Sequence, residues 1–174
     1  MVVRTSGAGW TQDVTIGRAE RHREDPAETA LSLAFLANAR GFHASAVTAQ
    51  DRFPRQAAHF LAIAIELSLK SYLLHLGFSD AWNRVHIGHD LGKALWCARG
   101  AGFHAVPSRL PPIATHLGPY YLGHAFEEME PEALAALGSN APEAVRTLHD
   151  AVSEAICQDE PFDVSIPAPS GLRS

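Results

Sequence analysis

The sequence predicts an all-α protein, and three observations support this fold class. Apolar residues recur at helical spacing in several stretches between residue 28 and residue 157. No stretch of four to eight residues alternates apolar and polar side chains with the β-branched enrichment of a strand. The chain has 174 residues, 47% of them hydrophobic and 19% charged, which is typical of one globular domain with its own core.

The helical domain is expected to span residues 25–158, between an irregular arm (1–24) and a Pro-rich tail (159–174). The arm mixes Gly, Thr, Arg and Glu without a usable period, whereas Asp25-Pro26 is a typical helix start. From Glu28 the apolar positions follow helical spacing as far as Ala46, which fits one bent helix or two.

The second helix is predicted to begin at Pro54 and to reach Leu76, where Gly77 ends it. It is apolar nearly all round, so we expect it at the centre of the fold. Further along, the sequence predicts a connection over Ser79–Ile87, a helix over about Gly88–Ala101, a short helix from Pro111 or Pro112 to about His124, and a last helix over Ala141–Cys157.

Charge and cysteine content narrow the class of protein. The net charge of −5 argues against a generic nucleic-acid binder, but residues 70–109 hold five basic and two acidic residues, so a polyanion would prefer this region. No signal peptide and no membrane-spanning apolar run is recognised. Cys97 and Cys157 both lie in apolar helical patterns, which predicts buried, reduced thiols and a cytoplasmic protein.

Two polar groups interrupt these patterns. Glu66 and Lys70 form an i, i+4 pair on the central helix, either as a structural ion pair or as support for a site. The segment from Asn83 to Lys93 holds Arg84, His86, His89 and Asp90 around a helix start. We expect His89 in the first helical turn, where the helix dipole favours a neutral imidazole, and Arg84 in the loop before it.

This combination suits the cleavage of RNA without a metal. His89 would take the proton of a ribose 2′-hydroxyl, and Arg84 would stabilise the charge on the phosphate. An Arg and a His at this spacing also occur by chance in a chain with 10 His, so a polar loop before a capped helix is the other interpretation.

Two motifs, E-x-x-x-K at Glu66–Lys70 and G-H-D-L at Gly88–Leu91, resemble the HEPN superfamily over about residues 28–102. The resemblance implies an up-and-down bundle of four to five helices, usually a homodimer, with no cofactor. In catalytic members an R-x(4 to 6)-H motif is a metal-independent ribonuclease site, which Arg84 and His89 match with four intervening residues. Lys93, His86, Asp90, Glu66 and Lys70 would then support the site.

Two alternatives stay open. HEPN-like proteins also act as non-catalytic nucleotide-binding or protein-interaction modules, or together with a nucleotidyltransferase-type partner. The sequence HDLGK also resembles the doublet of HD-type metal phosphohydrolases, in which His59, His89, Asp90 and Asp150 would be the metal ligands. The other histidines, Trp82, Trp96 and the pair Tyr120-Tyr121 are interpreted as core, surface or interface residues.

Overall fold

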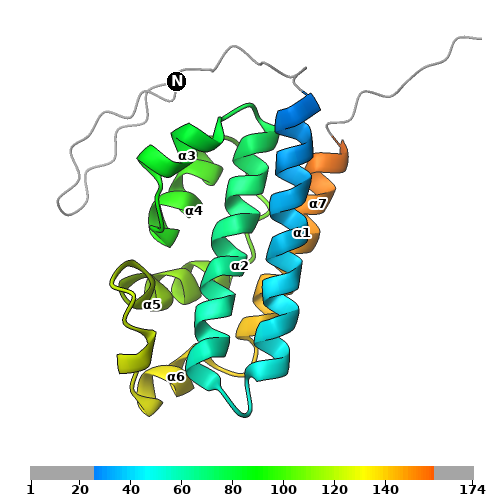
Figure 1. The fold of residues 1–174 in the computed structure, drawn as a ribbon. Coiled ribbons are helices and arrows are strands. Elements are labelled where there is room, and N and C mark those ends of the chain that lie inside the picture. Colours follow the sequence, from blue (N-terminus) through cyan, green and yellow to red (C-terminus); the bar gives the residue numbers. More distant parts are fainter. Residues whose placement is uncertain (1–25, 159–174) are drawn as a thin grey trace, which may run out of the picture.

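Residues 26–158 are described by a computed structural model, and every regular element in that range is helical, as predicted (Figure 1). The predicted arm and tail lie outside the described residues. The elements are α1 (Pro26–Ala49), α2 (Pro54–His75), α3 (Asp80–His86), α4 (Leu91–Gly100), α5 (Leu110–Leu122), the 3₁₀ turn η1 (Phe126–Glu128), α6 (Pro131–Leu137) and α7 (Ala141–Gln158).

The two longest helices, α1 and α2, pack side by side along the molecule. α1 is one continuous helix, and α2 begins at Pro54 and ends just before Gly77, whose φ of 87° is the left-handed conformation that favours glycine. Ser32 on α1 and Ser71 on α2 are both buried, and each hydroxyl donates to the backbone carbonyl of the other residue at 2.8 Å. These small residues let the two backbones approach closely and leave neither hydroxyl unsatisfied.

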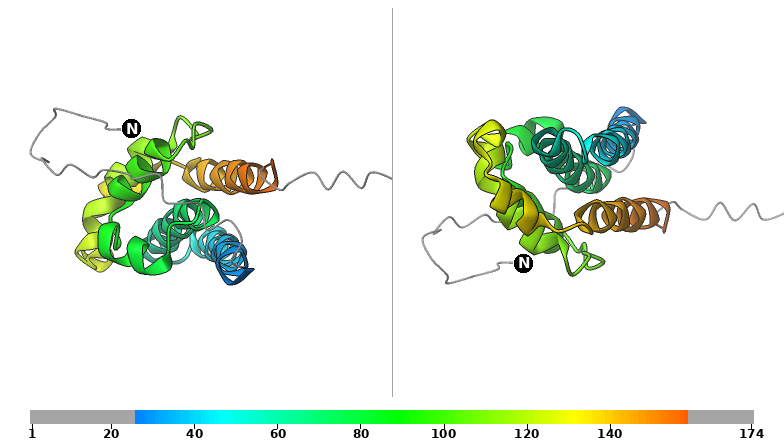
Figure 2. Two further views of the ribbon diagram at one scale, coloured as in Figure 1. Left: turned by 90° about the horizontal axis from the view of Figure 1, so that it is seen from above. Right: turned by 90° about the horizontal axis from the view of Figure 1, so that it is seen from below.

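The central position predicted for α2 is confirmed. It contacts each of the other helices as well as η1, and seen end-on it lies between α1, α7 and the shorter helices (Figure 2). By length and composition α2 could cross a membrane, but 78% of its most apolar window is buried inside the fold, as in the core helix of a globular domain. The apolar composition of α2 is therefore explained by its burial in the core.

The prediction of a plain connection over Ser79–Ile87 is wrong, because this segment contains α3. Ser79 is its N-cap, with a side-chain oxygen that accepts from the backbone N–H of Trp82 at 3.1 Å. α3 buries only Asn83, so it lacks the apolar stripe from which a helix is recognised in a sequence.

The start of the next helix is also displaced from the prediction. α4 begins at Leu91 rather than at Gly88, and Asp90 caps it by accepting from the backbone N–H of Lys93 at 2.9 Å. Gly88 has a φ of 57°, which a helix does not allow. His89 therefore lies in the turn between α3 and α4, not in the first turn of a helix.

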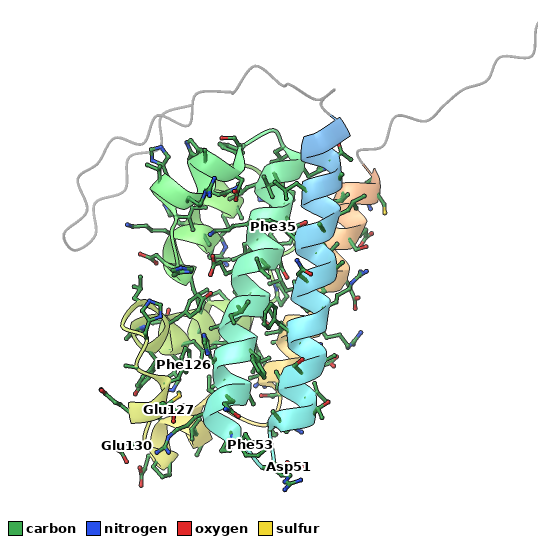
Figure 3. All side chains as sticks on the ribbon, viewed as in Figure 1. Phe35, Asp51, Phe53, Phe126, Glu127 and Glu130 are labelled. Carbon is green, nitrogen blue, oxygen red and sulfur yellow. The ribbon has the colours of Figure 1, made fainter. Side chains whose placement is uncertain are left out.

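The segment between α5 and α7 holds two elements that the sequence did not predict, η1 and α6. α6 has only seven residues, and its apolar side chains Ala133, Leu134 and Leu137 are partly buried against the core, so the segment is too short to show a helical period in the sequence. Phe126 in η1 is buried, whereas Glu127 and Glu130 are exposed at the end of the molecule where the α1–α2 turn also lies (Figure 3).

The two cysteines differ in burial. Cys97 is buried, as expected, and burial raises the pKa of its thiol to about 11, which keeps the thiol protonated. Cys157 is exposed, so the prediction that it is buried is wrong. It lies one residue from the end of α7, directly after Ile156, which is buried in the core, so Cys157 is on the solvent side of the helix.

Candidate active site

A buried carboxylate on α2 is the centre of the candidate site. Glu66 and Lys70 are 4% and 6% exposed, and Lys70 Nζ lies 2.5 Å from Glu66 Oε1. Lys70 Nζ also donates to the backbone carbonyl of Gly88 at 2.7 Å. Lys70 therefore connects α2 to the turn between α3 and α4. Gly88, whose carbonyl accepts this hydrogen bond, has the left-handed backbone conformation of that turn.

His89 binds the second oxygen of the same carboxylate. Its Nδ1 lies 3.0 Å from Glu66 Oε2, and 56% of the His89 side chain is exposed. Tyr121 on α5 donates its hydroxyl to the same Oε2 atom in a short hydrogen bond, and the Tyr121 ring meets the His89 ring edge-on at 5.3 Å. We call Glu66, Lys70, His89 and Tyr121 the Glu66 cluster. It joins α2, the α3–α4 turn and α5 through one carboxylate.

The cluster determines which nitrogen of His89 carries the proton. A carboxylate accepts hydrogen bonds, so Nδ1 of His89 is the donor in its contact with Glu66. A neutral imidazole then has its free lone pair on Nε2, away from the carboxylate. The helix dipole that the sequence suggested as the reason for a neutral His89 does not apply, because His89 precedes the helix; Glu66 orients the ring instead.

Burial makes Tyr121 a permanent donor to this carboxylate. Burial, followed by the hydrogen bond to Glu66 and the charge of Glu66, raises the pKa of the Tyr121 phenol well above its usual range. The phenol therefore keeps its proton at any ordinary pH. Lys70 and Tyr121 together hold Glu66 in place from two sides.

Two further imidazoles lie around Tyr121. The ring of His59, from α2, stacks on Phe126 at 4.8 Å and lies 5.9 Å from Tyr121. Burial, followed by the charge of nearby His124, lowers the pKa of His59 and favours its neutral form. His124, just beyond the end of α5, is exposed, and its ring centroid is 6.1 Å from that of His89.

The predicted site residues divide into three groups. Glu66, Lys70 and His89 come together in the Glu66 cluster, as described above. Asp90 caps α4, and its carboxylate lies 3.9 Å from Lys93 Nζ, so these two form a local pair on the helix that follows His89.

Arg84 and His86 lie on α3, not in a loop as predicted. The Arg84 side chain is 72% exposed, and its guanidinium lies 3.3 Å from the Asp80 carboxylate one turn earlier. His86 is exposed and its ring packs on that of Trp82 at 4.8 Å. The interactions of Arg84 and His86 are thus with residues of their own helix.

The ligand set of an HD-type site is not assembled. Asp150 lies on α7, where its carboxylate pairs with Arg146 at 2.8 Å. Within residues 26–158 no group of three or more His, Cys, Asp or Glu side chains is placed to hold one metal ion. His59, His89, Asp90 and Asp150 therefore do not form the metal centre that the HDLGK sequence suggested.

Sequence reasoning missed two residues of the site, Tyr121 and His124. Tyr121 is 55 positions from Glu66 in the chain, and a tyrosine in an apolar helix gives no sign that its hydroxyl has a charged partner. His124 follows a glycine at the end of a predicted helix, but a single sequence does not tell which distant group faces it.

Comparison of the chain with family models, curated proteins and solved structures gives no significant match. The resemblance to the HEPN superfamily thus depends on the motifs around Glu66 and His89 and on the all-helical fold.

Proposed function

We propose that this protein is a HEPN-like, metal-independent endoribonuclease with His89 as its general base. The observation that carries the proposal is the hydrogen bond from Nδ1 of the exposed His89 to the buried Glu66 carboxylate. A carboxylate that fixes the tautomer and the orientation of an exposed imidazole is the arrangement by which a histidine serves as a base. A purely structural ion pair between Glu66 and Lys70 would not need this third partner.

In the proposed reaction Nε2 of His89 accepts the proton of a ribose 2′-hydroxyl. The 2′-oxygen attacks the adjacent phosphorus and forms a 2′,3′-cyclic phosphate, while the bond to the 5′-oxygen of the next nucleotide breaks. Glu66 stabilises the imidazolium that forms on His89. Lys70 is buried and bound to Glu66 and Gly88, so its role is to hold the carboxylate rather than to touch the substrate.

Arg84 would stabilise the negative charge on the phosphorane. Its partner Asp80 lies on the same exposed helix face, and an exposed ion pair of this kind contributes about 1 kcal/mol or less. The guanidinium can therefore exchange Asp80 for a phosphate, to which it offers a planar pair of donors. Lys93 follows His89 by four residues, and its side chain is 47% exposed, so it would add a second positive charge.

The expected homodimer is also part of the proposal. Val85, next to Arg84 on α3, is 78% exposed, and Leu122 at the end of α5 is 53% exposed. Large apolar side chains beside a polar site are typical of a surface that a partner covers. A second copy that covered these side chains would bring groups from both chains to the substrate.

The test is the cleavage of a panel of single-stranded and structured RNAs in EDTA. We expect products with 2′,3′-cyclic phosphate ends, about 10²–10⁴-fold slower cleavage by His89→Ala, and about 10²–10³-fold slower cleavage by Arg84→Ala. His104→Ala, which removes an exposed histidine between α4 and α5, is the matched control and is expected to cleave at the wild-type rate.

Two results would contradict the proposal and favour another function. If the folded protein binds nucleotides or RNA with no turnover, and His89→Ala leaves the affinity intact, the protein is a binding module. If phosphate-ester hydrolysis is lost in EDTA and restored by manganese, the protein is a metal phosphohydrolase.

A further inference from the structure

His124 is held close to the proposed base by the same contacts that form the Glu66 cluster. It lies two residues beyond the end of α5, and α5 is attached to Glu66 through Tyr121. The rings of His89 and His124 are 6.1 Å apart between centroids, at an angle of 72°. Both side chains are exposed, so a group in solvent can reach both imidazoles. At this separation, hydrogen bonds of about 3 Å from each ring would allow one phosphodiester to bridge them.

The backbone at His124 is unusual. Within residues 26–158 it is the only non-glycine residue with a positive φ, at 52°. For a residue with a Cβ atom this conformation costs about 1–2 kcal/mol, which a glycine would avoid. The preceding residue is Gly123, but its φ is −84°, so the chain does not use this glycine for the left-handed position. His124 is the residue after the C-cap of α5: its backbone N–H donates to the Tyr121 carbonyl at 3.4 Å, and that of Ala125 donates to the Tyr120 carbonyl at 2.9 Å. The left-handed residue therefore ends the helix and fixes the direction in which the chain leaves it.

The proposed reaction needs a second proton transfer that the Glu66 cluster does not supply. An alkoxide is a poor leaving group, so the 5′-oxygen must receive a proton as its bond to phosphorus breaks. Lys70 and Tyr121 are buried and directed at Glu66. His59 is partly buried, stacked on Phe126 and kept in its neutral form. His124 is the exposed imidazole that remains.

We propose that His124 is the general acid of the site and protonates the leaving 5′-oxygen of an RNA phosphodiester. In this step the bond between the 2′-oxygen and phosphorus forms and the bond between phosphorus and the 5′-oxygen breaks. The proton of the 2′-hydroxyl goes to Nε2 of His89, and a proton from the His124 imidazolium goes to the 5′-oxygen. No other reactant is consumed, and solvent returns both rings to their starting forms. This inference rests on the proposed ribonuclease function and assigns its second catalytic residue.

The test compares two substrates that differ only in their leaving group. One is a short RNA, and the other is uridine 3′-(4-nitrophenyl phosphate), whose nitrophenolate leaves without a proton. His124→Ala is expected to slow RNA cleavage by about 10²–10⁴-fold and to change the release of nitrophenolate by less than about threefold. His89→Ala is expected to slow both reactions, because both need the 2′-hydroxyl to be deprotonated.

His124→Gly separates catalysis from folding. Glycine takes the left-handed backbone without strain, so this variant is expected to be at least as stable as wild type and to show the same selective loss of RNA cleavage. His104→Ala is again the matched control and should behave as wild type on both substrates.

The outcomes separate this inference from the proposed function. If wild type cleaves RNA and His89→Ala does not, but the His124 variants cleave RNA at the wild-type rate or lose both reactions equally, His124 is not the acid and the ribonuclease function stands. If folded wild type cleaves neither substrate, the ribonuclease function and the role of His124 both fail.

Discussion

Replacement of Lys70 by methionine should strongly destabilise the protein. Methionine keeps most of the side-chain volume, but it removes the cation that lies 2.5 Å from Glu66 and the donor to the Gly88 carbonyl. Glu66, only 4% exposed, would then have hydrogen bonds from Tyr121 and His89 alone. A buried charge that loses its partner typically costs about 3–5 kcal/mol, so we expect the free energy of unfolding to fall by about that amount.

Urea unfolding followed by circular dichroism measures this change, and a double-mutant cycle gives its cause. Glu66→Gln combined with Lys70→Met removes both charges, so the double variant should be more stable than the two single costs predict, by up to about 3 kcal/mol. The exposed pair Arg146 and Glu143 provides the comparison, because Arg146→Met should leave the urea midpoint almost unchanged. A loss below 1 kcal/mol for Lys70→Met would refute the reasoning, because the pair would then behave as a solvated one.

Two further predictions concern stability and pH. The pKa of Tyr121 is raised in the folded protein, so its contribution to the free energy of unfolding is present below about pH 10 and is lost as the pH rises further. Tyr121→Phe should lower the free energy of unfolding by about 1.5–3 kcal/mol at pH 7. Above pH 10 the free energy of unfolding should fall less steeply with pH in Tyr121→Phe than in wild type. Burial lowers the pKa of His149, on the α7 face against α1, from 6.5 to about 4. Its contribution is therefore present above pH 6.5 and lost as the pH falls towards 4, with an upper limit of about 3 kcal/mol. Urea midpoints at pH 7 and pH 5 should differ clearly less for His149→Gln than for wild type, and equal differences would contradict this assignment.

The helices that bury a continuous apolar face could be predicted from the sequence. Pro54 and Gly77 bracket α2, and its apolar residues on both faces predict a central position. α3 and α6 could not be predicted in the same way, because they bury one residue and none. Their helices depend on end signals such as the Ser79 cap and on packing against α2, which a pattern of apolar residues does not report.

The candidate site was predictable only where its residues are close in the chain. Glu66 and Lys70 are one helical turn apart, and His89 stands in a dense polar segment, so the sequence indicates all three as candidates. Their arrangement was not, because the contact between Glu66 and His89 spans 23 positions and depends on how the α3–α4 turn folds over α2. Tyr121 and His124 come from α5 and its end, and only the packed structure places them beside His89.

The most direct test of the account is the tautomer of His89. In an 18.8 kDa protein the two ring nitrogens can be distinguished by long-range ¹H–¹⁵N correlation spectra, recorded at a pH at which the imidazole is neutral. We expect the proton on Nδ1 and the lone pair on Nε2, with the balance shifting towards protonated Nε2 in Glu66→Gln, whose amide can donate to the ring. A wild-type His89 with its proton on Nε2 would contradict the account, because the exposed nitrogen could then not accept a proton from the substrate.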